Sequence, residues 1–113
     1  MKKLILALPF FLLSFIISAQ KTVTTWHDEA KTIVKEIYTV KKTSTGQEVK
    51  DGLYRIYYPD KVLWQEGHFV NNKLSGLWKD YYEDGTLKQE MPYTNDLLNG
   101  TLKYYSPSGA LQQ

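Results

Sequence analysis

The sequence predicts an all-β protein in which antiparallel β-hairpin repeats form one elongated, twisted meander sheet. Gly52, Gly76 and Gly100 follow one another at intervals of 24 residues, and the stretches that begin at them align without a gap. In each stretch a run rich in aromatic residues leads into a turn sequence such as Asp84-Gly85, and a second run follows. A fixed period in the twenties is typical of repeat architectures, in which one unit cannot bury its own face and neighbouring units stack.

The aligned units carry the same kinds of residue at the same positions. The shared columns are Tyr57, Tyr81 and Tyr105; Arg55, Lys79 and Lys103; Leu63, Leu87 and Leu111; and Glu66 with Glu90. We therefore expect a repeat domain over residues 20–113, with units at 52–75, 76–99 and 100–113 and a degenerate first unit at 26–50.

The start of the chain has the composition of a secretory signal peptide. Met1-Lys2-Lys3 is basic, Leu4 to Ile17 is almost wholly apolar, and Ser18-Ala19-Gln20 supplies small residues for cleavage. The apolar stretch is shorter than the roughly 20 residues that span a bilayer, and Pro9 interrupts it. We expect residues 1–19 to be removed near Ala19, which places the mature protein in the periplasm or outside the cell.

Charge and cysteine content exclude several classes of function. The whole chain has 14 lysines and arginines against 12 aspartates and glutamates. Because Lys2 and Lys3 belong to the signal segment, the mature domain is balanced in charge, which disfavours nucleic acid or an anionic membrane as the main partner. The chain has no cysteine, which excludes disulfides, thiol catalysis and cysteine-bound metals.

The turn sequences predict the hairpin register and thereby two faces. Asp-Gly between two strand-like runs indicates a two-residue hairpin loop, and Asp60-Lys61 takes its place one unit earlier, with a strain cost at Lys61. Such loops put Lys79 opposite Glu90, Arg55 opposite Glu66, Tyr82 opposite Leu87 and Tyr58 opposite Leu63.

Strand alternation then sorts the side chains. The expected core face carries Tyr54, Trp78, Leu102, Tyr58, Tyr82, Leu63, Leu87, Leu111, Phe69, Tyr93 and Met91. The opposite face carries the basic column, the Glu66 and Glu90 column with ion pairs Arg55–Glu66 and Lys79–Glu90, and the row Tyr57, Tyr81 and Tyr105 with Trp64 beside Tyr57.

The remaining turns and the upstream segment are predicted from local chemistry. Asn71-Asn72-Lys73 and Asn95-Asp96-Leu97 indicate connections between hairpins, since Asn and Asp tolerate left-handed backbone geometry. The glycine that begins each unit is expected to permit close approach of strands or rings. Residues 32–38 resemble the later second strands at an offset of thirty residues, with a longer polar loop within 41–50. We expect a strand there, and a short helix over residues 28–38 is the alternative.

The sequence GLWKDYYEDGTLKQE of residues 76–90, together with its copies, resembles the MORN repeat in its bacterial variant. The resemblance covers roughly Trp26 to Gln113, and exported chains of this kind look like the YwqK-type antitoxins of toxin–antitoxin systems. It implies a β-hairpin repeat fold and a binding or scaffolding role, with no catalytic residues to carry over.

Few residues suggest chemistry. His68 and Glu66 have the period-two spacing of one strand face, but a third metal ligand is missing, so a surface histidine is the better interpretation. Asp80 occupies a core-facing position and is expected to bond to Gln65 or Gln89. Asp28, Glu29 and Glu36 are interpreted as a solvated patch. We predict no metal site, no cofactor and no nucleophile motif.

These observations predict an exported, non-enzymatic repeat module that binds a protein partner in the cell envelope. The candidate binding residues are Tyr57, Tyr81, Tyr105, Trp64, Arg55 and Lys79, and strand addition at the edge of the last unit is a second mode of contact. The alternatives are a carbohydrate-binding module that stacks tyrosines on sugar rings and an antitoxin-like or immunity-like protein that neutralises a toxin.

Overall fold

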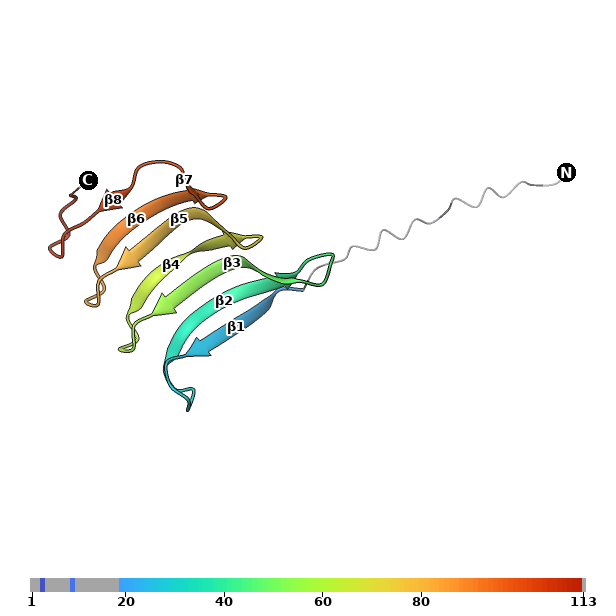
Figure 1. Cartoon of the computed structure of the whole chain (residues 1–113), viewed down its shortest axis with the longest axis horizontal. Coiled ribbons are helices and arrows are strands. Elements are labelled where there is room, and N and C mark those ends of the chain that lie inside the picture. Colours follow the sequence, from blue (N-terminus) through green and yellow to red (C-terminus); the bar gives the residue numbers. More distant parts are fainter. Residues whose placement is uncertain (1–2, 4–8, 10–18, 113) are drawn as a thin grey trace.

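The protein forms one antiparallel meander sheet (Figure 1), as the sequence predicts. The computed structural model describes residues 19–112, together with Lys3 and Pro9, and these residues contain no helix. Neighbouring strands pair in the order β1 to β7, and β8 pairs with β6 beside β7. The strands are β1 (Lys21–Trp26), β2 (Val34–Lys42), β3 (Glu48–Tyr57), β4 (Leu63–Val70), β5 (Lys73–Tyr81), β6 (Leu87–Thr94), β7 (Leu97–Leu98) and β8 (Lys103–Tyr104). The apolar segment that predicts a signal peptide lies, apart from Pro9, outside the described residues.

The loops that follow Tyr58, Tyr82 and Ser106 contain three residues each, so the predicted two-residue loops are wrong. The Tyr58 N–H donates to the Val62 carbonyl at 2.8 Å, and the Tyr82 N–H donates to the Thr86 carbonyl at 2.8 Å. The third loop residue has positive φ, +72° at Lys61 and +88° at Gly85. This is the other common hairpin solution, a turn followed by one left-handed residue.

A β-bulge in the following strand cancels the extra loop residue. The register shifts between Ile56 and Tyr57 on β3, and between Asp80 and Tyr81 on β5. Beyond the bulge, the predicted partners Arg55–Glu66 and Lys79–Glu90 are confirmed. Nearer the turn the predicted pairs are wrong by one residue, because Leu63 pairs with Tyr57 and Leu87 pairs with Tyr81. Paired side chains share a face, so these leucines lie opposite the predicted core face.

At the other end of the sheet, the predicted connections join β4 to β5 and β6 to β7 through two-residue turns. Both residues of Asn71-Asn72 and of Asn95-Asp96 have positive φ. The Asp96 carboxylate ties the second of these turns to β5, because it accepts the Leu74 N–H at 2.6 Å. These turns require left-handed backbone at two successive positions, which explains the Asn and Asp residues there.

The periodic glycines sit where the strands are irregular. Glu66 pairs with Lys79 but His68 pairs with Ser75, so β5 holds two more residues than β4 between these pairs. Gly76 lies in this bulge with φ +74°, and Gly52 and Gly100 have φ +116° and +131°. A Cβ on Gly76 would meet nothing within 4 Å, so the expected close approach is wrong for this residue. Its backbone conformation requires glycine there.

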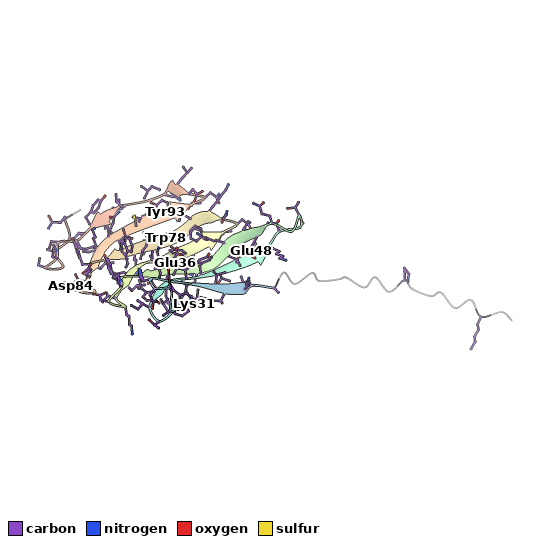
Figure 2. The ribbon with its side chains drawn as sticks, turned by 60° about the horizontal axis from the view of Figure 1, so that its bottom comes forward. Lys31, Glu36, Glu48, Trp78, Asp84 and Tyr93 are labelled. Carbon is purple, nitrogen blue, oxygen red and sulfur yellow. The ribbon has the colours of Figure 1, made fainter. Side chains whose placement is uncertain are left out.

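The expected approach is found at Gly100, where a Cβ would lie 2.9 Å from the Pro92 ring, and a still closer one occurs at Gly67, in the middle of β4. A Cβ on Gly67 would lie 2.1 Å from an atom of the Trp78 ring. Trp78 is only 3% exposed, and its indole N–H donates to the His68 carbonyl at 3.2 Å. The absent side chain therefore leaves the space that buries the Trp78 ring. Figure 2 labels Trp78 among the side chains of the sheet.

We call the face that holds Tyr54, Trp78 and Met91 the core face, because these three side chains form its buried cluster. Phe69 lies edge-on to Trp78 with centroids 5.1 Å apart, and Tyr54 lies 5.7 Å from Trp78. The partly buried residues packed on this cluster are Tyr38, Ile56, Phe69, Leu74, Tyr93 and Leu102. The predicted core positions Tyr54, Trp78, Met91, Phe69, Tyr93 and Leu102 are thus confirmed.

Lys50 covers one end of this aromatic cluster. Its ammonium lies 5.0 Å from the Tyr38 ring centre, 5.4 Å from that of Tyr54 and 5.2 Å from that of Phe69. A cation over ring faces is attracted to their negative quadrupole. The lysine therefore acts as part of the core while remaining half-buried.

The first hairpin follows the strand interpretation and not the helix alternative. Residues 27–33 form a turn in which the His27 N–H donates to the Ile33 carbonyl at 2.8 Å. The Asp28 carboxylate accepts the Thr32 and Ile33 N–H groups at 3.0 and 2.9 Å. The Thr32 hydroxyl also donates to this carboxylate. That bond has the largest effect and, with the bond from the Ile33 N–H, holds the pKa of Asp28 below its ordinary value. Asp28 is thus a turn cap and not only part of a solvated patch.

Strand pairing changes the predicted alignment of the first unit by one residue. Ile37 pairs with Arg55, as Glu66 pairs with Lys79, so Ile37 is the counterpart of Glu66. Glu36 therefore lies on the core face, where it pairs with Ile56. The extra residues within 41–50 lengthen the strands of the β2–β3 hairpin, which a turn at residues 43–47 closes.

Glu36 joins the first three strands through hydrogen bonds, so the prediction of a solvated carboxylate is wrong. Tyr54 on β3 donates its hydroxyl to Glu36 at 2.6 Å, and Thr25 on β1 donates at 2.8 Å. Burial alone would raise the pKa of Glu36, but these two bonds together with the charges of Lys50 and Lys35 outweigh it and keep the pKa below its usual value. Burial and the same bond raise the pKa of Tyr54, which stays a neutral donor.

Two glycine substitutions separate ring burial from backbone strain. Gly67→Ala should lower the free energy of unfolding by more than about 3 kcal/mol, because the new methyl group overlaps the Trp78 ring. Gly76→Ala should cost only about 1–2 kcal/mol, since its φ is strained but its surroundings are open. Urea denaturation measures both variants, and an equal loss in the two would show that Gly67 does not house the ring.

The Glu36 network predicts a pH dependence of stability. Its folded pKa is lowered, so its contribution is fully present above the ordinary value of 4.5 and is lost as the pH falls through the folded pKa. Glu36→Gln should therefore cost about 1 kcal/mol at pH 7, a figure reduced by partial exposure, and should flatten the acid side of the stability curve. The exposed Glu29→Gln serves as control and should change neither. Identical acid profiles for wild type and Glu36→Gln would contradict the assignment.

Candidate binding surface

The face opposite the core carries a row of alternating charge. Successive cross-strand partners run Arg55, Glu66, Lys79, Glu90 and Lys103 from β3 to β8. We call this side the tyrosine face, because Tyr57, Tyr81 and Tyr105 lie along it toward the end of the three-residue loops. Register alone produces the alternation, since each hairpin places one basic and one acidic residue opposite each other.

Hydrogen bonds fix two of the three tyrosines to this row. Tyr81 donates its hydroxyl to Glu66 at 3.4 Å, and Tyr105 donates to Glu90 at 2.8 Å. Burial and then the Glu66 charge raise the pKa of Tyr81, and the bond to Glu90 raises the pKa of Tyr105. Tyr57 has no side-chain hydrogen-bond partner within residues 19–112, because its neighbouring strand offers Ile37 where the later units offer a glutamate.

The two predicted ion pairs have different outcomes. Arg55 and Glu66 form a salt bridge with an N–O distance of 3.3 Å. Lys79 and Glu90 are register partners, but they are absent from the ion pairs within 4.0 Å that the described residues form, and Glu90 bonds to Tyr105. The guanidinium of Arg55 is half-exposed, so the salt bridge contributes little to stability and keeps the group accessible.

Apolar side chains also lie on the tyrosine face, contrary to the predicted arrangement. Leu63, Leu87 and Leu111 pair with Tyr57, Tyr81 and Tyr105, because the bulge shifts them from the predicted core face. Trp64 is predicted beside Tyr57 on the tyrosine face, but it stacks instead on Tyr58, a residue of the predicted core face, with centroids 5.3 Å apart and an interplanar angle of 18°. Trp64 as a whole is 43% exposed, which keeps it available to a partner.

A shallow groove of about 410 Å³ lies between the charged row and two exposed leucines. Leu53 and Leu77 are 37% and 44% exposed. The lining residues are Leu53, Arg55, Glu66, Gly67, His68, Leu77 and Lys79. Sequence reasoning missed the two leucines, although the recurring Gly-Leu at residues 52–53 and 76–77 was the available signal.

The other singled-out polar residues have structural partners. Gln65 donates to the Asp80 carboxylate at 2.7 Å, which confirms the expected bond. The His27 ring nitrogen Nε2 lies 2.8 Å from the Tyr57 carbonyl oxygen. Within the described residues, no three or more His, Asp or Glu side chains come together as metal ligands would. The helix needed for a membrane span is likewise missing from that part of the chain.

Comparison with known families agrees with the hairpin repeat. The family described as MORN repeat variant matches residues 50–71 and 74–95. The two matches coincide with the β3–β4 and β5–β6 hairpins, so one repeat corresponds to one hairpin. The match supports MORN-type repeats at residues 50–95, and repeats of this family are non-catalytic modules that often bind proteins or membranes. Searches of curated proteins and of solved structures found no significant match.

Proposed function

We propose that the protein is an exported, non-enzymatic repeat module that binds a protein partner in the cell envelope through its tyrosine face. The observation that carries this proposal is the open groove of Leu53 and Leu77 beside the charged row. Export is supported by the basic, apolar and small-residue order of residues 1–20.

The composition of this face fits a protein surface. It combines exposed leucines, partly buried tyrosines and an accessible Arg55, and aromatic residues and arginine carry much of the binding energy at protein interfaces. Its charges alternate in sign, which favours a mixed partner surface over a polyanion. The groove is open and shallow, which suits an extended contact more than an enclosed small molecule.

A carbohydrate is the second candidate, because the half-exposed ring of Trp64 is available for stacking on a sugar. An antitoxin-like or immunity-like role is a special case of protein binding in which the partner is a toxin. A glycan array separates sugar binding from protein binding.

Capture from an envelope extract tests the proposal. A full-length chain with a C-terminal tag should retain its partner, and replacing Tyr57 and Tyr81 together with serine should reduce capture at least tenfold. The double variant should keep its circular dichroism spectrum, because neither ring belongs to the buried cluster of the core face. The matched control is Tyr104→Ser, which removes a 44% exposed tyrosine from the opposite face.

Several results would contradict the proposal. Equal capture by the wild type and the double variant would remove the tyrosine face from the interface, and unfolding of the double variant would make the row part of the core. Sugar binding lost in Trp64→Ala would favour the carbohydrate alternative. Mass spectrometry of the captured chain should find an N-terminus near Gln20, and an intact Met1 would contradict export.

A further inference from the structure

Around Tyr57 the first hairpin departs from the pattern that the later hairpins share. The later units place Glu66 and Glu90 where they accept the hydroxyls of Tyr81 and Tyr105. Ile37 stands at this position in the first hairpin, so the Tyr57 hydroxyl is left without a side-chain partner within residues 19–112. Ile37 thus replaces the tyrosine–glutamate hydrogen bond of the later units with an apolar surface beside the unbonded Tyr57 hydroxyl.

A pocket of about 300 Å³ occupies this place. Its lining consists of Val34, Ile37 and Tyr57, with Thr32 and Lys61 as further polar contributors. This volume is at the lower limit of ligand-binding pockets, and the lining is mainly apolar with few polar groups, as such pockets require. A single side chain is the natural size of its occupant.

Lys61 is the second departure from the repeat. It has φ +72° at the turn position that Gly85 and Gly109 occupy with φ +88° in the later units. Left-handed backbone is unfavourable for a lysine and costs glycine little. Strain of this kind is typically retained where a side chain has a task.

The charge of Lys61 is available to a ligand. Its ammonium takes part in no ion pair or side-chain hydrogen bond formed by the described residues. The nearby carboxylates are engaged by their own turns, since Asp28 accepts the Thr32 and Ile33 N–H groups and Asp60 accepts the Val62 N–H at 3.3 Å. An apolar pocket with an unpaired cation and a free hydroxyl favours an apolar group that carries a carboxylate.

We propose that this pocket binds the apolar C-terminal residue of the protein partner. The side chain of that residue would contact Val34, Ile37 and the Tyr57 ring, and its carboxylate would bind the Lys61 ammonium and the Tyr57 hydroxyl. Within a protein, only the C-terminal residue carries both an apolar side chain and a carboxylate on the same Cα atom, and the two groups are then close enough to share a pocket of this size. The inference rests on the proposed function, because it takes the ligand to be part of a protein.

A titration with two matched probes tests the inference. N-acetyl-leucine should shift the amide resonances of Ile37, Tyr57 and Lys61 in the ¹⁵N-labelled full-length protein, whereas N-acetyl-leucinamide, which lacks the carboxylate, should bind at least tenfold more weakly. Lys61→Gly should lose binding at least tenfold and yet raise the Tm, because it introduces the glycine of the later turns. Ile37→Glu, which supplies the later units' partner for Tyr57, should also abolish binding.

Lys31→Gly is the matched control, because Lys31 also has positive φ (+56°) but does not line the pocket. It should raise the Tm and leave the titration unchanged. Equal binding of the acid and the amide, or full binding by Lys61→Gly, would overturn the inference. Partner capture does not enter this titration, so a failure of the proposed function would be seen separately in the capture experiment.

Discussion

The structure depends on keeping the large rings of successive hairpins on one face of a single sheet. The described residues form one layer, so neighbouring hairpins bury each other's rings where another fold would use a second layer. Tyr54, Phe69 and Trp78 can meet only if the alternation of side chains between the two faces is in step from one hairpin to the next. A one-residue slip would turn the rings to the opposite face. The loops, bulges and periodic glycines are the parts of the backbone that keep this alternation in step.

The sequence predicts the fold and the partners beyond each bulge, and its errors have identifiable causes. Opposite charges at Arg55 and Glu66 indicate the right register because the three-residue loop and the bulge cancel each other. Because the two features cancel, the sequence pattern reveals neither of them, and it predicts Leu63 and Leu87 on the wrong face. The sequence pattern aligns Glu36 with Glu66, thirty residues later. Strand pairing instead makes Ile37 the counterpart of Glu66, so the predicted position of Glu36 is wrong by one residue. The Glu36 carboxylate accepts hydrogen bonds from two neighbouring strands, and this role can be recognised only when the strand pairing is known.

The tyrosine face follows from the same geometry. Once rings occupy the core face, alternation directs Arg55, Lys79 and the row Tyr57, Tyr81 and Tyr105 to the opposite face, where they remain partly accessible. Repetition gives this face a regular row of charges, which alone would suit many partners. Specificity therefore has to come from departures from the repeat, and those are concentrated in the first hairpin, at Ile37 and Lys61.

Thiol labelling would test most directly whether one face is buried and the other open. The chain has no cysteine, so a single introduced thiol reports only its own position. Leu77 is 44% exposed and Met91 is 8% exposed on opposite faces of the neighbouring strands β5 and β6. Leu77→Cys should react with a maleimide at nearly the rate of a free thiol, and Met91→Cys should react at least a hundredfold more slowly in the folded protein. Similar rates, or a faster reaction at residue 91, would contradict the assignment of the two faces.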